Sequence, residues 1–250
     1  MTIELGVGDT RLRADHRADT VVEVSPSDPD NEADVKTAKA VSVEFAAGEL
    51  QVRAPKQRGL FSRLGSVDVT VDLPAGSDVR GAAREAAFRG TGRLGDCSFR
   101  TSTGDVRMEE TGSLVASTSV GDIIADRVNG PVELTTGSGV VRIRELVGPG
   151  TIRNSNGVIS VDRAHTGVAA KAANGDIRIG EVARGTVVLS TSIGQLEVGI
   201  GGGSAALLDV RSVTGTVHNL MTAVDGPGPA DEVVEVHAST TVGDVTIRRV

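Results

Sequence analysis

The chain has 250 residues, which is enough to form a sizeable core in one large domain or two small ones. Tryptophan and tyrosine are absent and phenylalanine occurs four times, so the core has to be built from aliphatic side chains. The net charge of −7 argues against a nucleic-acid partner, because the phosphates would need a basic protein face.

Residues 1–90 have the alternation of strands but no strict repeat. Alternating and β-branched residues predict strands at Thr2–Val7, Arg11–Ala14, Thr20–Val24, Val41–Phe45, Glu49–Ala54 and Ser66–Leu73. Between the third and fourth strands, Asp30 or Asn31 can cap a short helix that carries Glu32 and Asp34 in its first turn. We therefore expect an irregular N-terminal β region with one short helix as a cap over exposed strand edges.

The loop at residues 55–65 mixes cations with apolar side chains between two predicted strands. Its candidate contact residues for a partner are Lys56, Arg58, Leu60, Phe61 and Arg63. Apolar residues among cations on a loop can dock to a partner or to an anionic surface. The alternative is that Leu60 and Phe61 pack against the end of the fold, since satellite clusters under long loops are common.

From about residue 91 to 220 the sequence repeats a T-x-x-G unit, often followed by Asp and an aliphatic residue. The turn glycines are spaced by 17, 18, 18, 18 and 19 residues and are Gly104, Gly121, Gly139, Gly157, Gly175 and Gly194. So short and steady a period is typical of stacked coils, each of which buries its apolar face only against its neighbours. The sequence thus predicts an all-β, parallel β-solenoid with about 18 residues and two short strands per coil.

Alternation inside each coil predicts which side chains point inward. Apolar residues lie two and four places after the turn glycine, as Ile177 and Ile179 do after Gly175. Residues 18 apart match better than residues nine apart, which favours parallel stacking over hairpins. The Asn-Gly pairs at Asn156 and Asn174 favour hairpins instead, although Asn-Gly also fits other bends that need positive φ.

The repeat loses its regularity after Gly194. Residues 221–232 are predicted to form a loop, and residues 233–250 a C-terminal closing coil around Gly243. Arg248 and Arg249 at its end would discourage another molecule from adding to the edge. We expect these parts to form a single structural domain; the oligomeric state is left open, although exposed end strands would allow a dimer.

Several features that resemble functional sites have simpler structural explanations. The aspartates that follow turn glycines lack the spacing of calcium-binding β-rolls, so we expect them to bond backbone amides. Cys97 falls in an apolar column and behaves there as a small buried residue. The Thr and Asn column at the start of each T-x-x-G unit is expected to satisfy neighbouring coils. The histidines have no metal-ligand spacing, so no catalytic, cofactor or metal residue is predicted.

The units resemble the bacterial β-strand-repeat family labelled a "putative adhesin" domain. The resemblance is carried by Ala172–Ile179, Ser66–Gly76 and Gly243–Arg249, among other segments, and covers nearly the whole chain. The family has no established activity, so the resemblance implies no catalytic or ligand residues.

The leading hypothesis is a non-enzymatic scaffold that binds a protein through its solenoid face or through the 55–65 loop. A surface or carbohydrate-binding adhesin is the alternative, although sugar recognition depends on the Trp and Tyr that the chain lacks. A polysaccharide-active enzyme needs long loops that build a carboxylate-lined cleft, for which 18-residue coils leave no room. With no secretory apolar core and no apolar run of about 18 residues, we expect a cytoplasmic protein without a membrane span.

Overall fold

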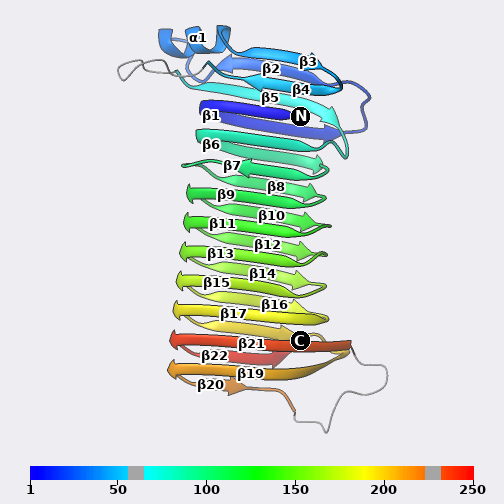
Figure 1. Ribbon diagram of the computed structural model, residues 1–250, viewed down its shortest axis with the longest axis vertical. Helices are drawn as coiled ribbons and strands as arrows, with labels where there is room; N and C mark the ends of the chain where they lie inside the picture. The colour runs from blue at the N-terminus through cyan, green and yellow to red at the C-terminus, as the bar shows by residue number, and fades with distance from the viewer. Residues whose placement is uncertain (56–64, 223–231) are drawn as a thin grey trace. The chain divides into compact units, whose positions relative to one another are not determined.

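The computed structural model describes residues 1–55, 65–222 and 232–250, which are nearly all β (Figure 1). The chain divides into two compact units, residues 1–122 and residues 123–250, called here the N-terminal and C-terminal units. Each is a stack of parallel strands, so the predicted all-β solenoid is confirmed. The finer division of the chain that the sequence suggests remains a prediction.

The N-terminal unit combines parallel coils with two antiparallel pairs. Its strands are β1 (Thr2–Asp15), β2 (Val21–Pro26), β3 (Ser42–Ala46), β4 (Glu49–Arg53), β5 (Val67–Pro74), β6 (Val79–Arg93), β7 (Cys97–Arg100), β8 (Val106–Thr111) and β9 (Leu114–Val120). β1 lies parallel to β4, β5 and β6, and β6 lies parallel to β7 and β8. The antiparallel pairs, β2 with β5 and β3 with β4, account for the missing sequence period in this region.

Two long strands, β1 and β6, each contribute to both walls of a coil. The start of β1 pairs with β4, and its second half, from Thr10 to Asp15, pairs with β5. Between these halves Gly8 has φ +139°, and a Cβ there would lie 1.8 Å from the carbonyl oxygen of Val67. The sequence-based prediction of two separate strands here was therefore wrong. β6 was missed altogether, because its Gly, Ala and Arg residues have low strand propensity.

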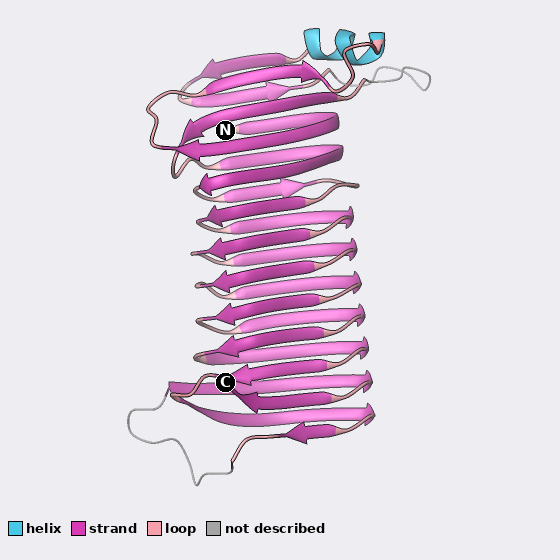
Figure 2. Ribbon diagram, turned by 180° about the vertical axis from the view of Figure 1, so that it is seen from behind, coloured by secondary structure: helices cyan, strands magenta, loops and turns pink. Residues whose placement is uncertain are grey.

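The helix α1 (Glu32–Lys39) begins where the sequence indicates. The Asn31 side chain accepts a hydrogen bond from the Ala33 amide at 2.9 Å and so caps the helix. The buried Asp34 and Thr37 accept hydrogen bonds from the amides of Ser66 and Gly65, at 2.8 and 2.9 Å, and tie α1 to the start of β5. Figure 2 shows α1 at the end of its unit that also holds β2 and β3. Within the described residues, no helix has the length and apolar character needed to cross a bilayer.

The C-terminal unit is more regular. Its strands are β10 (Ile123–Val128), β11 (Val132–Ser138), β12 (Val141–Leu146), β13 (Gly150–Asn156), β14 (Ile159–Ala164), β15 (Val168–Asn174), β16 (Ile177–Val182), β17 (Gly185–Ile193), β18 (Leu196–Ile200), β19 (Ser204–Thr214), β20 (Val217–Asn219), β21 (Glu232–Val242) and β22 (Val245–Arg249). Like strands pair in parallel, so that Val141 lies beside Ile159 and Ile159 beside Ile177. This register confirms the parallel reading and rejects the hairpins.

Aliphatic rows fill the interior of both units, as the alternation predicts. The predicted inward residues of β12, β14 and β16, such as Val141, Ile159 and Ile179, are completely buried. In the N-terminal unit the rings of Phe88 and Phe99 pack with centroids 5.0 Å apart. At roughly 1.5–3 kcal/mol for each buried aliphatic side chain, these rows are the main stabilising contribution. A single coil buries too few of them to offset its backbone entropy.

The order of the coils departs from the order of the sequence at the C-terminus. β21 lies between β17 and β19, and β22 lies between β18 and β20, so the last coil of the chain is inserted before the preceding one. The prediction that Arg248 and Arg249 guard an exposed edge was therefore wrong. Arg248 instead pairs with Glu197 at 2.8 Å, and Arg249 donates to the carbonyl oxygen of Gly201 at 2.7 Å.

Candidate functional site

The turn glycines and the residues that follow them form columns along the coils. In the N-terminal unit Gly8 is in register with Ala86, and the neighbouring Glu85 is in register with Thr103, which precedes Gly104. The next column holds Asp9, Ala87 and Asp105. Alanine therefore replaces aspartate in the middle of this column.

Turn aspartates hold the next coil by its backbone. Asp105 accepts a hydrogen bond from the amide of Asp122 at 2.9 Å, and Asp96 accepts one from the amide of Ser113 at 2.9 Å. In the C-terminal unit Asp176 accepts a hydrogen bond from the amide of Gln195 at 2.8 Å. These contacts confirm that the aspartates bond backbone amides. In the described residues, no group of three or more side chains is arranged to hold a metal ion.

A polar hollow of about 590 Å³ opens on the N-terminal unit where Ala87 interrupts the aspartate column. Its lining includes Gly8, Ala86 and Gly104, which have little or no side chain. Carboxylates surround it and come from β1, β5, β6 and the turn before β8: Asp9, Asp68, Glu85 and Asp105. Ala87 stands where an aspartate would continue the column, and the acidic residues define the chemistry of the hollow.

Each carboxylate of the hollow has an arginine partner. The N–O distances are 2.9 Å for Arg89–Asp9, 3.1 Å for Arg11–Asp68, 3.2 Å for Arg84–Glu85 and 3.0 Å for Arg107–Asp105. All these side chains are partly exposed, so each pair contributes about 0–1 kcal/mol. A carboxylate has about four sites for hydrogen bonds, so acceptor capacity remains for an incoming ammonium or guanidinium group.

Cys97 is the potentially nucleophilic side chain that the sequence analysis considered. Cys97 is 2% exposed, and burial together with the nearby Asp78 raises the pKa of its thiol to about 12. Because the thiolate is the reactive form, a thiol with this pKa is inert at neutral pH. Cys97 is thus a packing residue, as its place in an apolar column predicts.

The predicted partner contacts lie outside the described residues: Lys56, Arg58, Leu60, Phe61 and Arg63. The chain is described again from Gly65, and its neighbour Ser66 lines the hollow. Sequence reasoning missed the hollow itself. The signal in the sequence was that Gly8-Asp9 and Gly104-Asp105 are both Gly-Asp pairs, whereas Ala86-Ala87 takes the place of such a pair between them.

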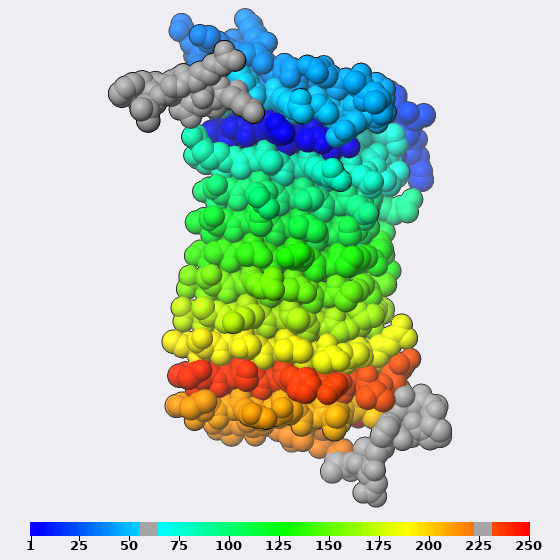
Figure 3. Space-filling model, in the orientation of Figure 1, coloured from blue at the N-terminus to red at the C-terminus, as the bar shows by residue number. Residues whose placement is uncertain are grey.

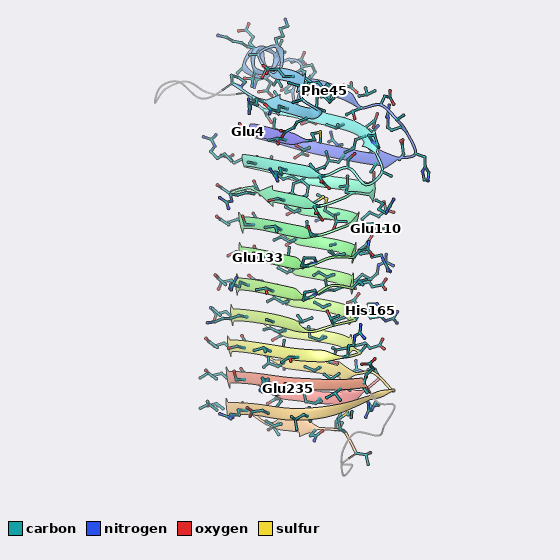
Figure 4. The ribbon with its side chains drawn as sticks, turned by 45° about the vertical axis from the view of Figure 1, so that its right-hand side comes forward. Glu4, Phe45, Glu110, Glu133, His165 and Glu235 are labelled. Atoms are coloured by element: carbon teal, nitrogen blue, oxygen red, sulfur yellow. The ribbon has the colours of Figure 1, made fainter. Side chains whose placement is uncertain are left out.

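The outer walls of the C-terminal unit carry ion pairs between neighbouring strands. Figure 4 shows Glu133, His165 and Glu235 projecting outward from this unit. Glu145 lies 2.9 Å from His165 Nε2, and this hydrogen bond, with Arg127 nearby, lowers the pKa of Glu145. In Figure 3 the side chains of this unit form successive layers with an even outer surface. Such walls offer flat contact area. They also hold a hollow of about 450 Å³ lined by Asp162 and Glu181, whose carboxylates pair with Arg142 and Arg163.

Comparison with known proteins places this geometry in a family. The model described as Toastrack DUF4097 matches residues 1–249. A "putative lipid binding protein" from Parabacteroides distasonis is similar in structure at 12% identity, with a TM-score of 0.53 over 100% of this chain and 92% of that one. A "putative adhesin" from Bacteroides fragilis is 12% identical, with a TM-score of 0.45 over 100% and 91% of the two chains. No curated protein matches. At this identity the likeness shows the fold and not the function.

Proposed function

The chain belongs to the Toastrack DUF4097 family, and we propose that it is a non-enzymatic scaffold that binds a protein partner. The observation that carries the proposal is the filled interior of both units, where, apart from the terminal coil of β19 and β20, the core aliphatic residues are at most 9% exposed. We therefore assign function to the outward side chains, which form flat walls and shallow hollows, among them the acidic hollow of the N-terminal unit. Flat and weakly concave surfaces suit a protein partner better than a small substrate, which needs an enclosing pocket.

We place the contact at the hollow of the N-terminal unit. Its carboxylates and the hydroxyls of Ser27 and Ser66 are acceptors that suit a lysine or arginine side chain of the partner. The sequence-based candidates at residues 55–65 precede Ser66 in the chain and remain a separate proposed contact. The solenoid face of the C-terminal unit is the second surface on which a partner would fit.

The names of the structural neighbours agree with a binding role in general. An acyl chain, however, would have to displace water from four carboxylates in this hollow, which is costly for an apolar ligand. A basic protein segment meets no such cost. The hollow therefore favours a protein partner over a lipid.

Charge reversal at Glu85 tests the proposal. Glu85 pairs with its neighbour Arg84 and is half-exposed, so Glu85→Lys changes the charge of the hollow without removing a turn aspartate. The matched control is Glu133→Lys in the C-terminal unit, where the glutamate is 63% exposed and lies 3.8 Å from Arg153. Captured proteins are quantified by mass spectrometry after cross-linking in the native host, and the affinity of the purified partner is then measured.

Wild type and Glu133→Lys are expected to capture the same partner, and Glu85→Lys is expected to bind it at least about tenfold more weakly. If only Leu60→Asp/Phe61→Asp weakens binding, the loop and not the hollow is the contact. If only Glu133→Lys weakens binding, the contact lies on the wall of the C-terminal unit and not at the hollow. Equal binding by all variants rejects all three locations. If the wild type reproducibly captures no protein, the scaffold function is rejected.

A further inference from the structure

The C-terminal unit ends in a coil that exposes its own interior. β19 pairs with β21 and β20 pairs with β22, and within the described residues no strand covers their other edges. Leu208 and Val210 are in register with the buried Val236 and Ala238, yet they are only half-buried themselves. Uncovered strand edges with aliphatic side chains are sites where a further strand adds.

The outer face of β19 adds an unusual pattern to this edge. Leu207 is 64% exposed and Val213 is 80% exposed. Between them Asp209 and Arg211 point to the same side, with Arg211 Nε donating to Asp209 Oδ1 at 3.1 Å. Edge strands are commonly protected by like-charged or inward-pointing groups. The outward residues of β19 are, in order, apolar, acidic, basic and apolar. If the same strand is reversed and placed alongside, each acidic residue faces a basic one and each apolar residue an apolar one.

We infer that β19 pairs antiparallel with β19 of a second copy of this chain, about a twofold axis at Val210. In that register Asp209 of each copy lies opposite Arg211 of the other. Leu207 of each copy likewise lies opposite Val213 of the other. Side chains directly opposite in an antiparallel pair point to the same face, so all these partners meet. Opposite charges across strands stabilise such a pair, and the symmetry repeats every contact.

Neighbouring registers lack this complementarity. An axis at Asp209 places that carboxylate opposite its own copy and Leu207 opposite a guanidinium. An axis at Arg211 places two guanidinium groups opposite each other, and an axis between residues brings inward side chains against outward ones. On the inner face the Val210 register sets Val210 against Val210 and Leu208 against Ser212, so the inner faces of the two copies adjoin. Asp209 has one further neighbour, His237, whose Nδ1 lies 3.6 Å from its carboxylate.

The test measures the mass of the full-length chain by sedimentation and light scattering over a range of concentrations. Wild type is expected to form a closed dimer. Asp209→Arg and Arg211→Asp each create like-charge contacts twice, so each variant is expected to dimerise at least about tenfold more weakly. Glu133→Lys, away from β19, serves as the control and should dimerise like the wild type.

Mixing the two single variants separates pairing from folding. Asp209→Arg presents two cations and Arg211→Asp presents two anions, so the mixture should form a heterodimer although neither variant forms a strong homodimer. The double variant Asp209→Arg/Arg211→Asp should recover the homodimer. A monomeric wild type, assembly beyond the dimer, undiminished dimers of the single variants, or a mixture that stays monomeric would each overturn the inference.

Discussion

Thr191 donates its hydroxyl hydrogen to the carbonyl oxygen of Gly175, 3.0 Å away on the neighbouring coil of the C-terminal unit. Equivalent contacts join Thr118 to Gly104, Asn154 to Gly139, Ser212 to Gly243 and Thr240 to Gly194. The repeated T-x-x-G sequence is therefore a ladder in which the polar side chain of one coil donates a hydrogen bond to the turn carbonyl of the preceding coil in the stack. This confirms that the column serves the coils and explains why its members are nearly all buried.

Replacing Thr191 by Val should remove one rung of this ladder. The Gly175 carbonyl would lose a buried donor, so the free energy of unfolding should fall by about 1–3 kcal/mol. Thr135→Val is the control, because Thr135 is exposed on the outer face of β11 and should change stability by less than about 0.5 kcal/mol. Urea unfolding measures both. Equal stability of Thr191→Val and wild type would show that the rung contributes nothing.

Gly104 should tolerate no side chain. It has φ +139°, and a Cβ would lie 2.1 Å from the carbonyl oxygen of Ala86. Gly104→Ala should therefore lower the free energy of unfolding by more than about 2 kcal/mol. A Cβ at Gly203 meets nothing within 4 Å, so Gly203→Ala should be close to neutral. Chemical denaturation compares the two, and a stable Gly104→Ala variant would contradict the tight stacking at this turn.

The stabilisation that Asp96 provides should depend on pH. Hydrogen bonds from the amide and hydroxyl of Ser113 lower the pKa of Asp96 below the ordinary aspartate value of 3.8. A lowered pKa means that the contribution is present above that value and is lost as the pH falls through the lowered pKa. The Tm of Asp96→Ala should accordingly lie below that of wild type at pH 7, and the gap should narrow in acid. A gap that is constant with pH would show that the ionised carboxylate is not the stabilising form.

Cys97 should resist thiol reagents in the folded protein. With a pKa of about 12 the thiol stays protonated at pH 8, and burial also blocks access. In denaturant the pKa returns to about 8.5 and labelling should become rapid. The rate of colour release from an aromatic disulfide reagent reports both states. Fast labelling without denaturant would contradict the packing of Cys97.

The sequence period predicted the regular coils because each coil repeats the same physical requirements. Inward aliphatic pairs such as Ile177 and Ile179 mark the core, and glycine at positive φ marks the turn. β6 escaped prediction because Ala86-Ala87 replaces Gly-Asp there, which removes the local signal while pairing with β1 still imposes the strand. Tertiary context decided this element, not propensity.

The order of the last two coils escaped prediction for another reason. Coils of like shape stack equally well on one another, so chain order alone does not fix their place. A signal was present in Asn219, which lies beside the buried Ile247 at a position where other coils have an aliphatic residue. A polar residue in an inward row is tolerated only where water reaches it, at the end of a stack. Predicting the hollow at Ala87 likewise required the register between strands that are distant in the sequence.

Nuclear Overhauser contacts along the backbone test the stacking of parallel coils most directly. For the isotope-labelled protein with its Hα protons retained, we expect contacts between Ile143 and Val161 and between Val161 and Ile179, the partners in register on β12, β14 and β16. Close Hα–Hα contacts between consecutive strands of the C-terminal unit, such as β12 and β13, signify antiparallel hairpins and would contradict the parallel stacking.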